Sequence, residues 1–214
     1  GITYFWESGD SFIVGNFPER FLAARPPDLS HIQFRVYIRP DQLDENQAKI
    51  LKSLNVKNLY IGLESSDDFV LNIANKKYTR KDIEKALDLA KKYALPIHIP
   101  FMLGLPGTTN QTLEEDLSLA KEIVSRFPNM KMIVSLPVLF PGTKLFNNIR
   151  NHPQASSEYP GDLFKDDFFD YKKLFELNVK YFTSVDYATI IDTYEQMKSL
   201  ITKKGNFTTF SLNK

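Results

Sequence analysis

Charged and aromatic side chains alternate with aliphatic ones in the segment "HIQFRVYIR". Neighbouring side chains of an extended strand point to opposite faces, so Arg35, Tyr37 and Arg39 share one face. Val36 and Ile38 share the other face. A parallel strand between two helix layers is expected to be apolar on both faces. We therefore predict that the charged face lines a polar cavity. The alternative is an edge strand with one face in water.

Two later strand-like segments show the same division. In "KNLYIGLE", Tyr60 and Glu64 oppose the aliphatic residues, and in "IHIPFML" His98 and Met102 do so. Three such strands together favour a sheet with one polar, concave face. A lone histidine is more often a satisfied core residue than a functional one, so both interpretations of His98 stay open. The predicted cavity residues are Gln33, Arg35, Tyr37, Tyr60, His98 and Met102.

Composition narrows the classes of protein. The chain has 214 residues, of which 43% are hydrophobic and 25% charged, with a net charge of +1. This is an ordinary globular balance, and the charge gives no strong nucleic-acid signal. No apolar run reaches the length of a membrane-spanning helix. The chain has no cysteine, which excludes disulfides and thiolate metal sites and fits a reducing, cytoplasmic compartment. Its three histidines lack metal-ligand spacing, so we predict no metal site.

Strand and helix patterns alternate along the first part of the chain. The predicted strands cover residues 2–6, 31–38, 57–64, 97–103 and 131–140, and the predicted helices cover 16–24, 44–54, 67–74, 110–126 and a segment that begins at Thr79 with a capping box. This order predicts an α/β fold with right-handed crossovers and a parallel sheet. We expect one unit over residues 1–150. Residues 151–214 would hold an irregular segment, 151–170, and a C-terminal helix from Asp186 to Lys203.

Four segments, in this order, carry a resemblance to a known family. They are "YFWESGDSF", "YIGLESSDDFVLNIANKKYT", "FMLGLPGTT" and "SLPVLFPGTKLF". Together they resemble radical S-adenosylmethionine (SAM) enzymes, particularly the group often fused to a cobalamin-binding domain, over residues 2–150. The resemblance implies a partial, TIM-barrel-like (β/α) barrel of six parallel strands. About five are expected here, because the first strand and its CxxxCxxC loop would precede Gly1.

The resemblance also implies roles for individual residues. Asp10 would approach the SAM amino group, and Glu64 would bind the ribose or the methionine end. Gly104 and Gly107 would let the backbone approach adenine. The residues implied in cofactor binding are Asp10, Arg39, Glu64, Gly104, Pro106, Gly107 and Pro137. Simpler interpretations stay open: a turn-forming aspartate, a salt-bridging or helix-capping glutamate, and a tight strand-to-helix turn.

The resemblance implies SAM and a 4Fe–4S cluster in the full-length protein, which would cleave SAM reductively to a 5′-deoxyadenosyl radical and act on an unknown, small-molecule substrate. Cobalamin would bind through an upstream domain. We expect none of these cofactors to be bound to this cysteine-free chain, and we therefore expect no activity from it alone. Departures such as Thr108, where the family has a glutamate, weaken the case for intact SAM binding. The alternatives are a cluster-free barrel that serves as a binding or scaffold module, and an unrelated (β/α) enzyme that uses Arg35, Arg39 and His98 on a small anion.

The missing first strand would leave residues 2–6 at an open sheet edge. Exposed edges present unpaired backbone groups that invite pairing with another chain. We therefore predict either self-association through residues 2–6 or coverage of this edge by the C-terminal tail, with residues 186–203 as the candidate cover.

Overall fold

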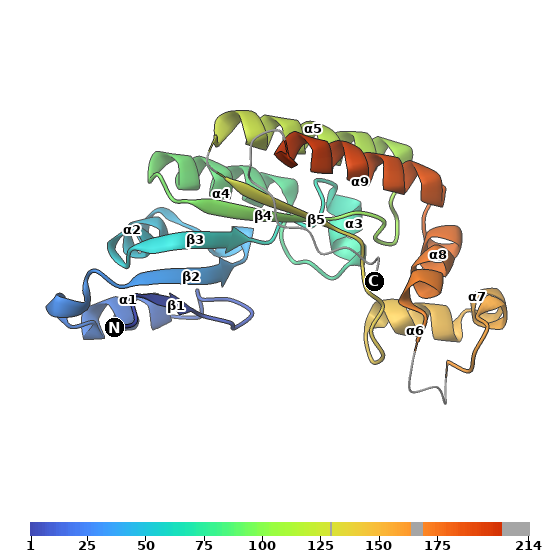
Figure 1. The fold of residues 1–214 in the computed structure, drawn as a ribbon, viewed down its shortest axis with the longest axis horizontal. Helices are drawn as coiled ribbons and strands as arrows, with labels where there is room; N and C mark the ends of the chain where they lie inside the picture. The colour runs from blue at the N-terminus through green and yellow to red at the C-terminus, as the bar shows by residue number, and fades with distance from the viewer. Residues whose placement is uncertain (129, 164–168, 203–214) are drawn as a thin grey trace.

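The computed structural model describes residues 1–128, 130–163 and 169–202 (Figure 1). Its strands are β1 (Tyr4–Trp6), β2 (Gln33–Ile38), β3 (Val56–Ile61), β4 (Ile97–Met102) and β5 (Lys131–Ser135). Its α-helices are α1 (Phe17–Ala24), α2 (Glu45–Ser53), α3 (Asp68–Ile73), α4 (Arg80–Lys92), α5 (Asn110–Arg126), α6 (Lys144–Asn151), α7 (Pro153–Glu158), α8 (Tyr171–Phe182) and α9 (Tyr187–Thr202). Short 3₁₀ helices cover Pro27–Leu29 and Pro40–Gln42.

The five strands form one parallel sheet in the order β1-β2-β3-β4-β5. A doubly wound sheet reverses its strand order part-way, whereas this order runs in one direction throughout. Right-handed crossovers in one direction place the connecting helices on the same face of the sheet, as in a (β/α) barrel. The predicted α/β fold with five parallel strands is confirmed. β2 lies between β1 and β3, so the alternative that it is an edge strand is wrong.

The helix-facing side of the sheet is the hydrophobic core. The buried strand residues on this side are Val36, Ile38, Leu59, Ile61, Ile97, Ile99, Phe101, Met132 and Val134. They belong to one cluster with helix residues such as Leu51, Leu87 and Ile123. Burying one such aliphatic side chain contributes about 1.5–3 kcal/mol, so this face fixes which way each strand points. The predicted division between the two faces of the strands is thereby confirmed.

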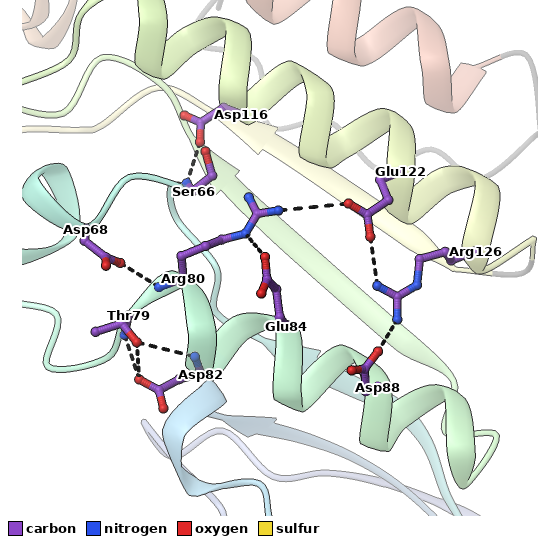
Figure 2. Close-up of polar contacts among 10 residues, drawn as sticks. All are labelled: Ser66, Asp68, Thr79, Arg80, Asp82, Glu84, Asp88, Asp116, Glu122 and Arg126. Carbon is purple, nitrogen blue, oxygen red and sulfur yellow. Dashed lines mark hydrogen bonds and ion pairs between the residues drawn. The ribbon is translucent and has the colours of Figure 1, made fainter.

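Helix starts in this part of the chain follow side-chain caps. Thr79 and Asp82 form the predicted capping box: the Thr79 backbone N–H donates to the Asp82 carboxylate at 2.8 Å, and the Asp82 N–H donates back to Thr79 Oγ1 (Figure 2). Thr109 and Thr112 form a second box at the start of α5. Each cap contributes about 1 kcal/mol. The caps therefore fix where the loops after β3 and β4 end.

The C-terminal part holds more helix than the sequence patterns predict. Residues 151–170 include α7, and α8 follows at Tyr171, although no helix is predicted for either segment. Residues 164–168 of the predicted irregular segment lie outside the described residues. The expected boundary at residue 150 falls within α6. The C-terminal helix is found at Tyr187–Thr202, close to its predicted start at Asp186, which caps it by accepting from the Thr189 N–H. Lys203 lies outside the described residues.

The position of α9 corrects one expectation. α9 packs against α5 and β5, at the sheet edge opposite β1 (Figure 1). Its apolar residues Ile190 and Met197 are buried in the core there, so they cannot cover residues 2–6. The prediction that residues 186–203 cover this edge is therefore wrong. The side chains of Ile2, Tyr4, Phe5 and Trp6 are all exposed.

The turn after β4 packs against the C-terminal helices α8 and α9. Gly104 has a φ of 84°, and a β-carbon there would lie 2.8 Å from Phe175 Cζ on α8 and 3.2 Å from Ile190 Cδ1 on α9. Asn178 on α8, which is fully buried, donates its side-chain N–H to the Gly104 carbonyl at 2.8 Å. The Gly107 N–H donates to the Phe182 carbonyl at 2.7 Å. Glycine at position 104 is thus required by backbone conformation and by close packing.

Gly104→Ala tests this packing. We expect a loss of roughly 2–5 kcal/mol in the free energy of unfolding, because backbone strain and overpacking each cost about 1–3 kcal/mol. The matched control is Gly142→Ala, since Gly142 has a φ of 85° but no heavy atom within 4 Å of the added methyl group. That variant should lose only the strain term. Urea unfolding of both variants measures the difference, and equal losses would refute the packing argument.

Candidate functional site

Aromatic and charged side chains from four strands meet on the sheet face away from the core. The strand register pairs Trp6 with Arg35, Tyr37 with Tyr60, and Tyr60 with His98. The Tyr37 and Tyr60 ring centroids are 4.6 Å apart, and those of Tyr60 and His98 are 4.5 Å apart. We call these five residues the inner-face cluster. The structure thus brings together four of the six predicted cavity residues, and Trp6 joins them without having been predicted.

Arg35 is the charged centre of the inner-face cluster. Its guanidinium carbon lies 3.9 Å from the Trp6 ring centroid and 4.2 Å from that of Tyr60. Its Nη2 donates to the Tyr37 hydroxyl at 2.5 Å. Cation–π contacts of this kind contribute about 0.5–2 kcal/mol. In the described part of the chain no carboxylate pairs with Arg35, so its positive charge is balanced by ring faces alone.

His98 is buried beside this cation. Burial lowers the pKa of His98 to about 4, and the positive charges of Lys131 and Arg35 add to the effect. The imidazole is therefore neutral near pH 7. Its Nδ1 is buried and has no hydrogen-bond partner among the described residues. The interpretation of His98 as a satisfied core histidine does not fit this geometry.

A second polar group lies where β2 and β3 end. Arg39 and Asp41 form a bidentate ion pair, with Nη2 to Oδ2 at 2.7 Å and Nε to Oδ1 at 2.9 Å. Glu64 pairs with Lys76 at 3.0 Å, as the salt-bridge interpretation predicts. Tyr78 lies between these pairs, its ring centroid 5.8 Å from the Arg39 guanidinium carbon. Burial and the nearby Glu64 raise the pKa of Tyr78, and its buried hydroxyl has no partner within the described ranges.

Glu64 is held in an unusual backbone conformation. Its φ is 63°, in the left-handed region where residues other than glycine are uncommon. It bridges to β4, since its N–H donates to the Pro100 carbonyl and its carbonyl accepts from the Met102 N–H. Such strain costs about 1–3 kcal/mol and persists where surrounding contacts enforce it, often at functional sites. Asn55, Asn75 and Ala94 also have a positive φ, but they follow the ends of helices, whereas Glu64 lies in a bridge between strands.

Asp116 on α5 holds the residues that follow Glu64. Its carboxylate accepts from the Ser66 backbone N–H at 2.5 Å (Figure 2). It also accepts from the Ser65 hydroxyl at 3.2 Å. Burial raises the pKa of Asp116 to about 6, although the serine hydrogen bonds act in the opposite direction. Sequence reasoning missed this residue. The available signal was a carboxylate on the apolar stripe of α5, between Leu113 and Ala120.

The other predicted site residues are more dispersed. Asp10 is exposed, in a loop fixed beside β2 by the Phe12 N–H, which donates to the Tyr37 carbonyl. No hydrogen bond or ion pair in the described part of the chain joins Asp10 to Arg39 or Glu64. The half-buried Gln33 and Met102 lie at the start of β2 and the end of β4, and Gly104, Pro106 and Pro137 are buried. The shared role of the seven predicted cofactor residues stays a prediction.

Ion pairs on α4 and α5 stabilise the helix-facing side of the sheet. Arg126 on α5 pairs with Asp88 on α4 at 2.5 Å and with Glu122 at 2.8 Å, and Arg80 pairs with Glu84 at 2.9 Å (Figure 2). The Arg126–Asp88 pair joins α4 to α5, the helices on either side of β4 in the chain, and Arg80 also reaches Glu122 at 4.0 Å. They lie on the outside of the helices, so we assign them a structural role.

Comparison with known proteins identifies the family. Residues 5–120 match the model of the radical SAM superfamily. The chain belongs to this superfamily. The alternative of an unrelated (β/α) enzyme is therefore wrong, although Arg35 and His98 do meet, while Arg39 is paired with Asp41 further along the sheet.

Relatives of known name are distant and longer. The chain is 32% identical to the heme chaperone HemW of Bacillus subtilis, over 44% of this chain and 24% of HemW. It is 22% identical to the anaerobic magnesium-protoporphyrin IX monomethyl ester cyclase of Cereibacter sphaeroides, over 65% of this chain and 22% of the cyclase. The chain thus spans about a quarter of the length of these relatives.

Solved structures show the same fold. The radical SAM methyltransferase TsrM of Kitasatospora setae, with cobalamin and a 4Fe–4S cluster bound, superposes with a TM-score of 0.64 at 15% identity, over 91% of this chain and 43% of TsrM. Coproporphyrinogen III oxidase of Escherichia coli, also a radical SAM enzyme, gives a TM-score of 0.52 at 14% identity, over 82% of this chain and 33% of the oxidase. The TIM-barrel-like radical SAM fold is confirmed.

The residues present fit the two expected cofactors differently. A thiolate-bound cluster does not fit, because the chain has no cysteine, and its described residues contain no group of three or more potential metal ligands. SAM fits better, since the unpartnered Tyr78 hydroxyl and the carboxylate of Glu64 suit a ligand with hydroxyl and charged groups.

No helix among the described residues has the length and apolarity needed to span a membrane.

Asp116→Asn tests the buried carboxylate that supports Glu64. The unfolded chain should release this proton near pH 3.8, whereas the folded chain retains it to about pH 6. The extra stability of the wild type is therefore fully present below about pH 3.8 and is lost as the pH rises to about 6, by roughly 3 kcal/mol.

Asparagine keeps an acceptor for the Ser66 N–H but does not titrate. We expect the stability of the wild type relative to Asp116→Asn to fall over this pH interval and to stay constant above it. Urea unfolding at several pH values measures this. Glu114→Gln, at an exposed carboxylate of the same helix, is the control. A difference independent of pH would contradict the assignment.

Proposed function

We propose that this chain forms the larger, C-terminal part of a radical SAM enzyme that in full length cleaves SAM reductively and acts on a small molecule in the cytoplasm. The observation that supports this most strongly is Glu64, held in a strained conformation where β3 ends, within a chain of this superfamily. The cluster would come from a cysteine loop outside this chain. Cobalamin would bind through a further domain.

In this proposal the two polar groups have separate roles. Glu64, Arg39 and the Tyr78 hydroxyl bind the polar parts of SAM, and Asp10 approaches from the loop after β1. The turn of Gly104, Pro106 and Gly107, together with Pro137, faces its adenine, and the bonds of the Gly104 carbonyl and the Gly107 N–H to α8 hold this turn in place. The inner-face cluster, with Gln33 and Met102 at its margins, binds the substrate. TsrM has been solved with a tryptophan substrate and a SAM analogue, which supports a small-molecule substrate as the class.

A cluster-free barrel that serves as a binding or scaffold module is the second candidate. The absence of cysteine and the presence of Thr108 in place of the family's glutamate favour it. The two candidates differ in whether a CxxxCxxC segment is encoded upstream of Gly1.

Iron–sulfur reconstitution of this chain tests the division of roles. We expect a colourless protein that retains no cluster and does not cleave SAM under reduction, because thiolate ligands are lacking. Absorption and electron paramagnetic resonance spectroscopy measure this. A stoichiometric, stably bound cluster would contradict the proposal.

Glu64→Gln in the protein extended upstream of Gly1 tests the SAM site. We expect the KM for SAM, measured by 5′-deoxyadenosine formation, to rise about tenfold, as the loss of a charged hydrogen bond predicts. The matched control is Glu84→Gln, on the helix side of the sheet. Equal effects of the two substitutions would argue against a role for Glu64. An extended protein without CxxxCxxC would favour the scaffold function.

We also propose that the exposed β1 edge mediates self-association. Its backbone groups are open and its side chains apolar, which invites strand pairing. Phe5→Lys should shift the protein towards monomer in sedimentation velocity, because a charge on an edge strand opposes pairing. Val14→Lys is the control, since Val14 is an exposed apolar residue outside β1. A wild type that is monomeric at all concentrations would overturn this proposal.

A further inference from the structure

The inner-face cluster presents a cation without a counter-ion. Arg35 comes from β2 and contacts a ring from each neighbouring strand, Trp6 on β1 and Tyr60 on β3. It is half-buried, and no carboxylate balances it in the part of the chain that is described. Half-buried cations in proteins are usually paired, because removing a charge from water is costly. The arrangement suits an anion from outside the chain.

Two buried nitrogens of the cluster lack partners. Arg35 Nε and His98 Nδ1 are both inaccessible to solvent and have no hydrogen-bond partner among the described residues. His98 as a whole is only 7% exposed. Buried polar groups are hydrogen-bonded in the great majority of cases, so a buried group without a partner requires an explanation. A ligand that accepts hydrogen bonds on this face would satisfy Arg35 Nε.

The shape of the cluster restricts the ligand further. Tyr37, Tyr60 and His98 form a row of rings at centroid spacings of 4.6 Å and 4.5 Å, tilted by 38° and 48° to one another. Ring edges attract the face of another planar group, so a row of tilted rings suits a flat ligand. Lys131 is in register with His98 at the far end of the row and adds a second positive charge. An aliphatic ligand would leave the rings unused, and a neutral ring would leave Arg35 without an anion.

We propose that the inner-face cluster binds a planar, anionic substrate, an aromatic or heteroaromatic carboxylate whose carboxylate pairs with Arg35 and whose ring packs against the edges of the Tyr60–His98 row. This inference rests on the proposed function, because it names the substrate class of the same cluster. His98 is neutral near pH 7, so it contacts the ring without adding charge. Lys131 draws the anion towards the row.

The protein carries its own probe for this binding. Trp6 is the only tryptophan of the chain, and the Arg35 guanidinium carbon lies 3.9 Å from its ring. An anion that engages Arg35 should therefore change the fluorescence of Trp6. We would titrate the wild-type chain with benzoate, which is planar and anionic, with benzamide, which is planar and neutral, and with cyclohexanecarboxylate, which is anionic but not planar. We expect benzoate to bind at least about tenfold more tightly than either analogue, equivalent to about 1.4 kcal/mol.

Variants assign the binding to Arg35. Arg35→Gln should weaken benzoate binding at least about tenfold, and Arg35→Lys should lie between, because lysine keeps the charge but not the flat, forked donor. Arg20→Gln, at an exposed arginine of α1, is the matched control and should bind as the wild type does. Circular dichroism checks that each variant is folded. The comparison of the three ligands on the wild type needs no variant, so a misfolded Arg35→Gln leaves the proposal testable.

Equal affinity for benzoate and benzamide, or no loss in a folded Arg35→Gln, would overturn the proposal. These titrations need neither SAM nor a cluster. An extended protein that cleaves SAM while the chain does not distinguish benzoate from benzamide would refute the substrate class alone. If the extended protein does not cleave SAM while the chain binds benzoate as expected, the proposed function is refuted but the anion site is retained.

Discussion

Each strand of the sheet has to bury one face under helices and keep the other free of them, and the rest of the structure depends on this constraint. The strand period of two residues separates Val36 and Ile38 from Arg35 and Tyr37 within a single strand. Burial of the aliphatic set fixes the orientation of the strand, because a shift by one residue would place Arg35 in the core. The position of the inner-face cluster is therefore a consequence of core packing.

The same dependence extends to Glu64. Its left-handed conformation is enforced by the bridge to β4 and by Asp116, which binds the next two residues from α5. α5 is in turn joined to α4 by Arg126 and Asp88 (Figure 2). The strain at Glu64 is thus carried by contacts from two helices and a strand. A site built in this way is rigid, which suits a carboxylate that has to meet one part of a ligand.

Much of this organisation could be predicted from local patterns, and the rest could not for physical reasons. Alternation over residues 31–38 predicts the face of Arg35, since periodicity and burial agree there. Trp6 was missed because its contact with Arg35 depends on strand register, which the sequence of β1 alone does not determine. Asp116 was missed because its partners, Ser65 and Ser66, are fifty residues away in the chain. α8 was missed although its buried residues Leu174, Phe175 and Asn178 follow helical spacing; its hydrogen bond to Gly104 is what only the structure shows.

The inner face of the sheet gathers several unpartnered polar groups in one place, which favours a site over a plain surface, whereas unpartnered atoms elsewhere, such as Ser66 Oγ and Arg25 Nη1, are scattered. On the helix side, Arg80 and Arg126 each have carboxylate partners. On the other side, Arg35 has none among the described residues, and neither His98 Nδ1 nor the Tyr78 hydroxyl has a hydrogen-bond partner there. Elsewhere, a buried amide such as Asn178 leaves its oxygen unpaired but still donates through its nitrogen. Unpartnered groups cost stability. Stability alone would favour apolar side chains on this face. The unpartnered polar groups found there are instead what binding requires.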